Sequence, residues 1–325
     1  MKILVTGGAG YIGGTVTQLL LDRGHAVVVY DNLCHGARSM VPAGATFIEG
    51  DVADSKRLEE IFGGDSFAGV MHFAALIEAG ESMQKPELYF RNNTAATLGL
   101  LEAMVKKKLT RLVFSSTAAV YGEPVSTPIA EEAALSPTNA YGESKLLVEQ
   151  MLSWIHRVHG LRYASLRYFN VAGAIPGRGE AHEPESHLIP LILDVALGRR
   201  KSIKIFGQDY PTVDGTCVRD YVHIRDLAEA HLLALGALGD DARPSRMIYN
   251  IGTGTGFTVR QVIDAARRVT GREIPVEECP RRDGDPAVLV AGSEKIKAEL
   301  GWDPQSGDLD TILASAWEWH QKRYL

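Results

Sequence analysis

Residues 6–13 read Thr6-Gly7-Gly8-Ala9-Gly10-Tyr11-Ile12-Gly13, with glycines at positions 7, 10 and 13. This spacing is typical of the turn between a strand and a helix that binds a dinucleotide. One glycine permits the tight turn, another lets a pyrophosphate approach the backbone, and the third packs the helix against the sheet. The apolar run Ile3-Leu4-Val5 precedes the turn, and residues 11–23 follow it with apolar side chains at helical spacing. This context predicts a phosphate site at the start of a helix rather than a plain glycine turn.

An aspartate follows the next apolar run. Ala26-Val27-Val28-Val29-Tyr30 reads as a second buried strand, and Asp31 comes directly after it, eighteen residues beyond Gly13. A carboxylate here accepts hydrogen bonds from the adenine ribose hydroxyls and repels a 2′-phosphate, so NAD is favoured over NADP. A second glycine-rich stretch, residues 252–256, precedes Thr258, a good helix cap, and we interpret it as a turn.

Apolar runs and helical segments alternate along the first half of the chain. Runs at 46–48, 69–73, 111–115 and 163–168 alternate with predicted helices at 55–62, 88–107 and 141–158. This alternation predicts an α/β fold with a doubly wound parallel sheet of the Rossmann type. Right-handed crossovers bring the carboxyl ends of its strands to one edge, where ligands bind.

The composition of the sequence and the order of its predicted elements change after residue 170. Residues 171–187 are rich in Gly, Pro, Glu and His, which is typical of an extended loop, and the elements beyond lack a clean alternation. We therefore expect residues 1–170 to form an NAD-binding Rossmann domain. Residues 171–325 are expected to form a second, smaller α/β lobe that binds the substrate. The return of segments near 218–250 to the first domain is left open.

Composition and charge exclude several classes of protein. The 325 residues carry a net charge of −6 and no long basic run, which argues against a nucleic-acid partner. No apolar stretch approaches the ~18 residues of a membrane span, and a first strand at Lys2 leaves no room for a signal peptide. The three cysteines, Cys34, Cys217 and Cys279, form neither a disulfide framework nor a zinc spacing. We therefore expect a cytoplasmic protein with no membrane partner.

Two histidines lie in the polar loop described above. His182 and His187 stand five residues apart, without a third ligand at metal-binding spacing. The sequence therefore predicts no metal ion.

A tyrosine and a lysine stand four apart in the stretch Tyr141-Gly142-Glu143-Ser144-Lys145. On a helix they project from the same face, one turn apart. Because an ammonium favours a nearby phenolate, we expect Lys145 to lower the pKa of Tyr141 from its usual ~10, so that the tyrosine can act as a general base. Such a pair alone is common on solvated helices. It gains weight from the glycine turn and from Ser115-Ser116-Thr117 at the end of a predicted strand.

In this order, the glycine turn, the Ser-Ser-Thr strand end and the Tyr-x-x-x-Lys pair resemble the extended short-chain dehydrogenase/reductase superfamily. Further segments resemble the UDP-glucose 4-epimerase family, from Met1 to about Trp302; they are residues 31–33, 120–122, 166–173, 206–212, 214–221 and 281–285. The resemblance implies that NAD+ stays bound and that carbon 4 of a UDP-linked sugar is transiently oxidised, which interconverts UDP-glucose and UDP-galactose. It also implies a homodimer through the helices at 88–107 and 141–158.

The resemblance implies roles for particular residues. Tyr141 takes the proton of the 4′-hydroxyl, Lys145 holds the cofactor ribose, and Thr117 bonds the same hydroxyl oxygen. The dinucleotide is held by Gly7, Gly10, Tyr11, Ile12, Gly13, Asp31, Asn32, Asp51, Val52, Phe73, Ala74, Asn92, Ser115, Tyr141, Lys145 and Tyr168. The UDP-sugar is held by Thr117, Asn170, His187, Leu188, Phe206, Arg219, Arg282 and Asp285.

Several of these residues have structural alternatives. Asp51 and Asp285 also fit loop carboxylates, Phe206 a core aromatic, and Asn92 a helix cap. Each arginine alone also fits a solvated surface position.

Three positions depart from the common pattern of the family. Ile77 stands where many members have a cofactor-contacting lysine, and His187 stands where some have an asparagine near the sugar. Leu289 stands at the position that gates the sugar pocket. Since leucine is smaller than tyrosine, N-acetylated sugars have more room, and a UDP-GlcNAc/UDP-GalNAc or UDP-pentose 4-epimerase is an alternative.

Ala118 and Ala119 separate an epimerase from a dehydratase. A sugar-nucleotide 4,6-dehydratase needs an Asp-Glu acid–base pair directly after the strand-end threonine, and alanine cannot transfer a proton. A non-catalytic nucleotide sensor would lack the Tyr-Lys pair, which this chain retains. A dehydrogenase that releases NADH in each cycle is a further alternative, and turnover without added NAD would exclude it.

Overall fold

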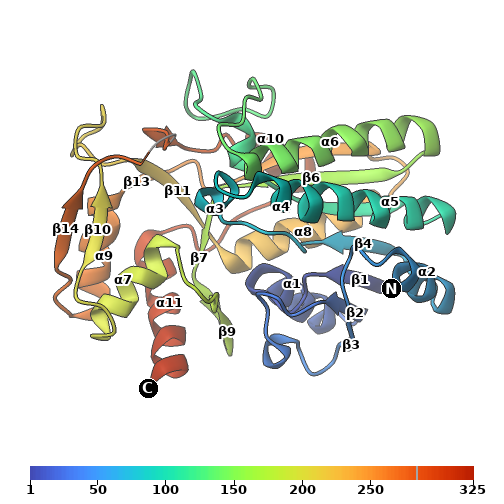
Figure 1. The fold of residues 1–325 in the computed structure, drawn as a ribbon, viewed down its shortest axis with the longest axis horizontal. Coiled ribbons are helices and arrows are strands. Elements are labelled where there is room, and N and C mark those ends of the chain that lie inside the picture. Colours follow the sequence, from blue (N-terminus) through green and yellow to red (C-terminus); the bar gives the residue numbers. More distant parts are fainter. Residues whose placement is uncertain (283–284) are drawn as a thin grey trace. The chain divides into compact units, whose positions relative to one another are not determined.

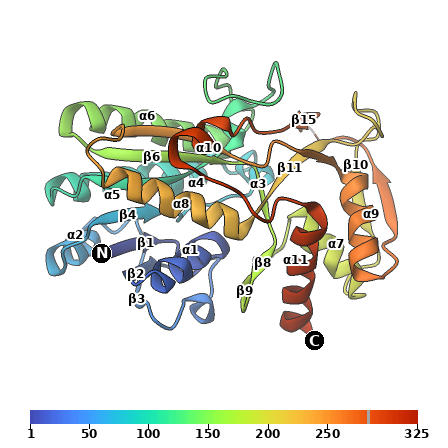
Figure 2. The ribbon, with the colours of Figure 1, turned by 180° about the vertical axis from the view of Figure 1, so that it is seen from behind.

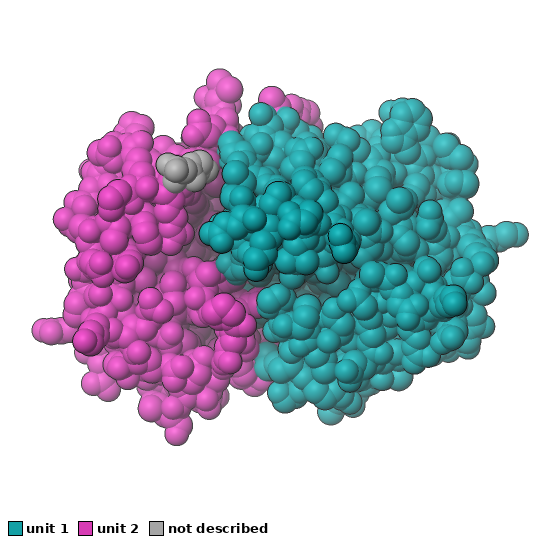
Figure 3. All heavy atoms as spheres, viewed as in Figure 1, with its two compact units in different colours: residues 1–122, 135–167, 228–249 teal, residues 123–134, 168–227, 250–325 magenta. Residues whose placement is uncertain are grey.

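The computed structural model describes residues 1–282 and 285–325. Contacts divide the chain into two compact units (Figure 3). The first comprises residues 1–122, 135–167 and 228–249, and the second comprises residues 123–134, 168–227 and 250–325. The first stretch of the second unit, residues 123–134, was not singled out by the sequence. Among the described residues, no helix is long and apolar enough to cross a membrane.

The first unit is built on a seven-stranded sheet with the order β12-β6-β5-β4-β1-β2-β3 (Figure 1). β1 pairs in parallel with β2 and with β4, and Leu4 lies opposite Val28 on one side and Val70 on the other. The β2–β3 and β4–β5 pairs are also parallel. The predicted doubly wound parallel sheet is therefore confirmed. The strands are β1 (Lys2–Thr6), β2 (Ala26–Asp31), β3 (Thr46–Glu49), β4 (Gly69–His72), β5 (Arg111–Thr117), β6 (Arg162–Tyr168) and β12 (Arg246–Ile251).

Helices cover both faces of this sheet (Figures 1 and 2). On one face, α2 (Ser55–Gly64), α5 (Ala96–Lys106) and α6 (Ala140–His159) bury Leu58, Leu100 and Val148 against the strands. On the other face lie α1 (Tyr11–Asp22) and α8 (Ile224–Leu238), which the ion pair Arg23–Glu229 joins. Short helical segments are α3 (Ala79–Ser82), α4 (Pro86–Tyr89) and the 3₁₀ turns at Arg38–Met40 and Ala118–Tyr121.

The predicted helix at 88–107 is interrupted. It consists of α4, a π-helical segment at Phe90–Ala95, and α5. The buried Asn93 side chain accepts from Leu76 N at 2.8 Å and donates to Leu76 O at 2.9 Å and Ser144 Oγ at 3.0 Å. The wider turn of the π segment thus lets one amide tie the loop after β4 to α6.

The second unit combines small sheets with helices. β11 pairs with β13, β15 and β7, β10 pairs with β14, and β8 pairs with β9. Ile192, Ile263 and Ile312 from three helices share its core. The elements are β7 (Asn170–Ala172), β8 (Ala174–Ile175), β9 (Arg178–Gly179), α7 (Leu188–Ala196), β10 (Ile203–Phe206), β11 (Val218–His223), β13 (Gly256–Thr258), α9 (Val259–Thr270), β14 (Val276–Cys279), β15 (Val288–Leu289), α10 (Glu294–Leu300) and α11 (Leu309–Tyr324).

The glycine-rich stretch at 252–256 is a structural turn. Thr258 caps α9 in a capping box with Gln261. The buried Asp220 carboxylate accepts from Thr253 N at 2.8 Å and from Gly254 N at 2.9 Å. Because these amides are already paired, they cannot cradle a phosphate, as the sequence predicted.

Candidate active site

The turn between β1 and α1 is shaped to receive a phosphate group. Gly7 has φ +73°, and a Cβ there would lie 2.5 Å from Ala74 N, so only glycine fits. Gly10 is the N-cap of α1 without a side-chain hydrogen bond, and the first turn of α1 contains no acidic residue. The first amides of α1 and the positive end of its dipole therefore suit an anion. Tyr11, Ile12 and Gly13 form this first turn.

The carboxyl ends of β2 and β3 bring together the residues expected around the adenine ribose. Asp31 is only 8% exposed; its carboxylate accepts from Ala9 N at 2.9 Å and from Leu33 N at 2.8 Å. Asn32 Nδ2 donates to Asp51 Oδ2 at 2.8 Å, and Val52 follows as a buried residue. Asp31 is thus fixed beside the glycine turn, at the carboxyl end of β2.

The residues after β4 lie against the same turn. Phe73 N donates to Thr6 O at 3.0 Å, and Ala74 is the neighbour that confines Gly7. His72, which the sequence did not single out, is buried between Thr6 Oγ1 at 2.7 Å and Thr97 Oγ1 at 2.8 Å. Burial lowers the pKa of His72 to about 3, so it is neutral and supports β4 structurally.

Thr117, Tyr141 and Lys145 meet where β5 ends and α6 begins. The side chains of Thr117 and Tyr141 share a hydrogen bond. Lys145 Nζ donates to Ser115 O at 2.9 Å and lies 5.1 Å from the centroid of the Phe114 ring. Gly142 permits this approach, because a Cβ there would lie 2.6 Å from Ala119 O. The spacing of four residues on α6 therefore puts the phenol and the ammonium at the edge of the sheet.

The pKa of Tyr141 does not show the expected effect of Lys145, so the lowering of this pKa stays a prediction. Burial raises the pKa of Tyr141, the hydrogen bond from Thr117 lowers it, and the charge of Glu78 raises it; Lys145 is not among the causes. Burial also lowers the pKa of Lys145 to about 7. The hydrogen bond from its ammonium to the Ser115 carbonyl joins it to a neutral group.

Replacing Lys145 by methionine is expected to stabilise the NAD-free protein near neutral pH. Folding lowers the lysine pKa from an ordinary value of ~10.4 to about 7. Between these values the unfolded chain binds more protons, so the wild-type free energy of unfolding rises with pH across that range. Thermal unfolding at several pH values should show this rise in the wild type and not in Lys145→Met. The exposed Lys56→Met is the control, and parallel curves for wild type and Lys145→Met would contradict the prediction.

A buried ionic network lies beside this pair and was missed by the sequence analysis. Ser116 Oγ donates to Glu149 Oε1 at 2.6 Å, and Arg167 binds both oxygens of Glu149 at 3.0 and 2.7 Å. Arg167 also donates to Tyr121 Oη at 2.8 Å. Glu149 stands four residues after Lys145, so this spacing on one helix face was the available signal. The network joins β5, α6 and β6.

In the second unit, several residues expected to bind the UDP-sugar lie together. Arg219 forms an ion pair with Asp285, and the Arg282 guanidinium lies 3.9 Å from the centroid of the Phe206 ring. Burial raises the pKa of Cys217, and the charges of Arg219, Asp285 and Arg282 act on the same thiol, so all three lie in its neighbourhood. This arrangement can receive a diphosphate and a planar base. Residues 283–284 of the segment 281–285 lie outside the described residues.

The sequence analysis did not single out Arg281 and its partners, which belong to the same segments as Arg282 and Phe206. Arg281 Nε donates to Asp209 Oδ1 at 2.6 Å, and its guanidinium lies 4.1 Å from the centroid of the Tyr210 ring. Leu289, the expected gate residue, lies opposite Arg219 in the β15–β11 pair. Asn170 begins β7 opposite Tyr221, and Tyr168 is buried in the second unit.

Four further positions from the sequence analysis lie at the start of α7, in the π-helical segment and in the loop after β4. His187 and Leu188 stand at the start of α7, where His187 Nδ1 contacts Glu185 Oε1 at 2.7 Å. Asn92 lies inside the π-helical segment and donates to Asn93 Oδ1 at 3.0 Å, so it does not cap a helix. Ile77 is partly buried in the loop after β4.

The structure places a candidate third ligand beside His182 and His187, which their spacing in the sequence did not indicate. The structure places the Glu180 carboxylate with them, and one ligand atom from each residue lies within 4.8 Å of the others. The sequence missed this because a glutamate two residues before a histidine has no recognised metal spacing.

A glycine turn at the end of β1, a buried aspartate at the end of β2 and a Tyr-Lys pair at the sheet edge are typical of Rossmann-fold enzymes that use a dinucleotide. The chain belongs to the NAD dependent epimerase/dehydratase family, whose model matches residues 3–252. Over 322 residues it is 53% identical to the UDP-glucose 4-epimerase of Streptomyces lividans, with 98% of this chain and 96% of that protein covered.

Solved structures agree with this assignment. The UDP-glucose 4-epimerase from Brucella ovis in complex with NAD has a TM-score of 0.94 and 43% identity, covering 98% of this chain and 97% of that one. The enzyme from Bifidobacterium longum in complex with NAD+ and UDP has a TM-score of 0.94 and 37% identity, covering 99% and 98%. These similarities confirm the predicted family, its resemblance to UDP-glucose 4-epimerases, and NAD as its cofactor.

Proposed function

We propose that this chain is an NAD-dependent UDP-glucose 4-epimerase, which interconverts UDP-glucose and UDP-galactose. The observation that carries the proposal is the hydrogen bond between Thr117 and Tyr141. Ala118 and Ala119 come directly after Thr117 in the sequence. This constellation offers a base for one hydroxyl and no acid–base pair for dehydration. The reaction that these residues support best is therefore the removal and return of hydrogen at one carbon of the sugar. This agrees with the relatives, which are called UDP-glucose 4-epimerases.

Each residue of the first unit has a defined part in this proposal. Bound NAD supplies the transient oxidation at carbon 4 of the sugar. Tyr141 removes the proton of the 4′-hydroxyl and returns it, and Thr117 orients the phenolic oxygen through their shared hydrogen bond. Lys145 lies one helical turn from Tyr141 and is proposed to hold the nicotinamide-side ribose. Asp31 is proposed to hold the adenine-side ribose and to exclude NADP.

The second unit is proposed to hold the UDP part of the substrate. Arg219 and Arg282 provide guanidinium groups for the diphosphate, and Phe206 provides a ring beside the base. The Arg219–Asp285 ion pair would open in favour of the diphosphate and the uridine ribose. Asn170, His187 and Leu188 are proposed to contact the sugar.

The test of the activity uses the purified protein without added cofactor. Incubation with UDP-galactose is expected to yield UDP-glucose, and the denatured protein is expected to release NAD. UDP-4-keto-6-deoxyglucose as the product would instead identify a dehydratase, and a strict requirement for added NAD would identify a dehydrogenase. The cytoplasm is the proposed location, on the basis of the cysteine pattern.

Replacing Leu289 by the larger tyrosine is expected to narrow the range of UDP-sugars that the protein turns over. If leucine at this place leaves room for an N-acetyl group, the wild type should turn over UDP-GlcNAc as well as UDP-glucose. Leu289→Tyr should then lower kcat/KM for UDP-GlcNAc by about tenfold or more, because an overfilled pocket costs about 1–3 kcal/mol. Its kcat/KM for UDP-glucose serves as the internal control. Absence of UDP-GlcNAc turnover in the wild type would remove this alternative, while UDP-arabinose tests the UDP-pentose alternative.

A homodimer is proposed through α5 and α6, which lie side by side in the first unit (Figure 1). Leu98 is 40% exposed on α5, and Trp154 and Val158 are 63% and 67% exposed on α6. Large apolar side chains exposed on adjacent helices mark an interaction surface. Trp154→Glu is therefore expected to yield monomers in light scattering after gel filtration, whereas the exposed Glu102→Ala should remain dimeric. A wild-type monomer would contradict the proposal.

A further inference from the structure

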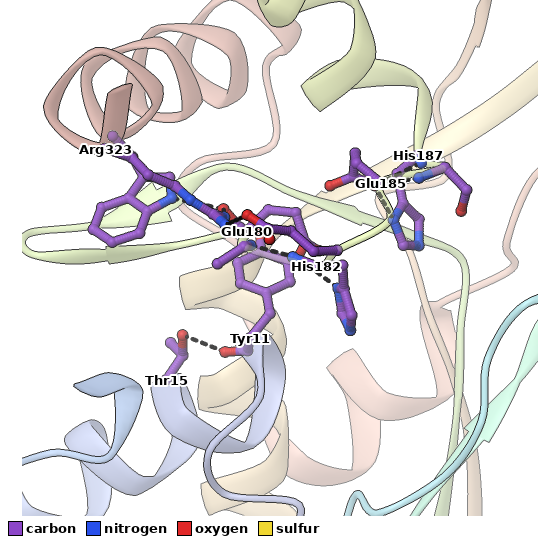
Figure 4. A network of polar contacts seen from close by, with 11 residues as sticks. Tyr11, Thr15, Glu180, His182, Glu185, His187 and Arg323 are labelled. Carbon is purple, nitrogen blue, oxygen red and sulfur yellow. Dashed lines mark hydrogen bonds and ion pairs between the residues drawn. The ribbon is translucent and has the colours of Figure 1, made fainter. Parts of the chain in front are cut away.

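The loop between β9 and α7 gathers two imidazoles and two carboxylates (Figure 4). Glu180, His182 and His187 each offer a ligand atom, and these atoms lie within 4.8 Å of one another. The side chains of His182 and Glu180 are 20% and 14% exposed, whereas that of His187 is 43% exposed. The group is thus mostly buried on one side and accessible to solvent through His187.

The position of the Glu180 carboxylate is fixed by several contacts. Its Oε1 accepts from Ala181 N at 2.7 Å and from His182 N at 3.0 Å, and His182 Nδ1 lies 2.6 Å away. The rings of His182 and His187 have centroids 5.7 Å apart and are tilted by 45°. Both imidazoles are therefore close enough to the carboxylate, and to each other, to share one small ion.

Glu185 holds His187 in the manner of an outer partner in a metal site. Glu185 Oε1 contacts His187 Nδ1 at 2.7 Å and also accepts from His187 N at 2.7 Å. When Nδ1 donates to this carboxylate, the lone pair of the ring lies on Nε2. Histidines that bind metals usually donate their second nitrogen to a carboxylate in this way, which sets the tautomer and the ring orientation.

Both ends of the loop are anchored in the second unit. Trp319 Nε1 and Arg323 on α11 donate to the Glu180 carbonyl at 2.7 and 3.2 Å, and Arg323 also donates to Glu183 at 2.8 Å. At the other end, His187 directly precedes α7. The ligands are therefore carried by a short segment that two helices hold, and little chain entropy is lost when an ion binds.

We propose that Glu180, His182 and His187 form a binding site for one divalent transition-metal ion of the zinc class. Two imidazoles and one carboxylate are a ligand set that zinc uses when a fourth position stays open for water or another ligand. Ligand atoms in a tetrahedral zinc site, at bond lengths of about 2.0–2.2 Å, lie about 3.4 Å apart. The ligand atoms lie within 4.8 Å of one another, and His182 Nδ1 and Glu180 Oε1 are 2.6 Å apart, so small side-chain rotations can bring all of them to this spacing. Any proton held between His182 and Glu180 leaves as the ion binds, because the ligating nitrogen must be unprotonated.

Nitrogen ligands also predict which ions are excluded. Mg²⁺ and Ca²⁺ prefer oxygen ligands, so millimolar Mg²⁺ should not compete with Zn²⁺ here. The site goes beyond the epimerase activity, which rests mainly on side chains of other segments. His187 alone is common to both, and its use as a metal ligand would remove it from direct contact with sugar.

The test is a Zn²⁺ titration of the full chain with its NAD, followed calorimetrically, with Co²⁺ absorption as a second probe. One equivalent is expected to bind, and Glu180→Gln and His182→Gln are each expected to weaken binding at least tenfold. Glutamine can still accept the loop amides at position 180, and thermal unfolding without metal checks the fold of each variant. His159→Gln, an exposed histidine on α6, is the matched control and should bind as the wild type does.

Glu185→Gln separates a built site from a chance group of ligands. Because it leaves all three proposed ligands in place, a weakening of about 10–100-fold would support Glu185 as the orienting partner. Zn²⁺ that binds to cysteine thiols would still bind to the double variant Glu180→Gln/His182→Gln. The binding measured for this variant is therefore subtracted from that of the wild type. Equal Zn²⁺ binding by the wild type and the double variant, or equal competition by Mg²⁺, would overturn the proposal.

Discussion

Tyr141→Phe is expected to lower kcat for UDP-galactose about 10³-fold, within the range that general acid–base catalysis supplies. The variant loses one oxygen, the one that shares a hydrogen bond with Thr117 at the end of β5. Since that oxygen is the proposed proton acceptor, nucleotide binding should survive while turnover does not. Steady-state kinetics, with NAD content and UDP affinity measured alongside, separates the two effects.

A second tyrosine provides the matched control for Tyr141. Tyr163 is buried in the core of the first unit, and Tyr163→Phe removes a phenolic oxygen of the same kind. It should retain nearly all of the wild-type kcat. Near-normal turnover in Tyr141→Phe would refute the assignment of the base, and a loss of NAD from that variant would indicate a binding role instead.

Glu149→Ala is expected to lower the free energy of unfolding by about 3–5 kcal/mol, the cost of leaving one charge of a buried ion pair uncompensated. Arg167 and Glu149 are 2% and 6% exposed in this pair. The Arg167 guanidinium would lose its carboxylate partner while keeping its hydrogen bond to Tyr121, and Ser116 would lose its acceptor. Urea unfolding measures the difference directly.

Two variants control for the loss of Glu149. Glu102→Ala removes an exposed glutamate from α5 and should change stability by no more than about 0.5 kcal/mol. The double variant Glu149→Met/Arg167→Met removes both charges, and should be more stable than Glu149→Ala because no buried charge is left alone. If Glu149→Ala unfolds at the same urea concentration as Glu102→Ala, the network of Glu149 and Arg167 does not contribute to the stability of the fold.

Local patterns were sufficient for the fold and for part of the candidate site. The turn at Gly7, the aspartate at position 31 and the pair on α6 were predictable because each follows from short-range rules of strand, turn and helix. The parallel sheet then brings the ends of β1, β2, β4 and β5 to one edge without further information. For this reason residues as far apart as Gly7 and Ala74 were expected at one place, and they are in contact.

Contacts with no local pattern were not predictable. The partners Glu149, Arg167 and Tyr121 come from three separate elements. Glu180 joins His182 and His187 through the path of one irregular loop. The pKa of Lys145 follows from burial rather than from its spacing to Tyr141.

The order of residues along the chain was enough to predict a Rossmann fold, a dinucleotide cofactor and a candidate base, because these depend on the periodicity of helices and strands and on the backbone freedom of glycine. The epimerase class was predicted from the resemblance of longer segments to a known family. Only the folded chain established which charges are paired, which are desolvated and which side chains lie close enough together to bind one metal ion. Desolvation and proximity arise when distant segments pack together, so they leave no mark on the spacing of residues in the sequence.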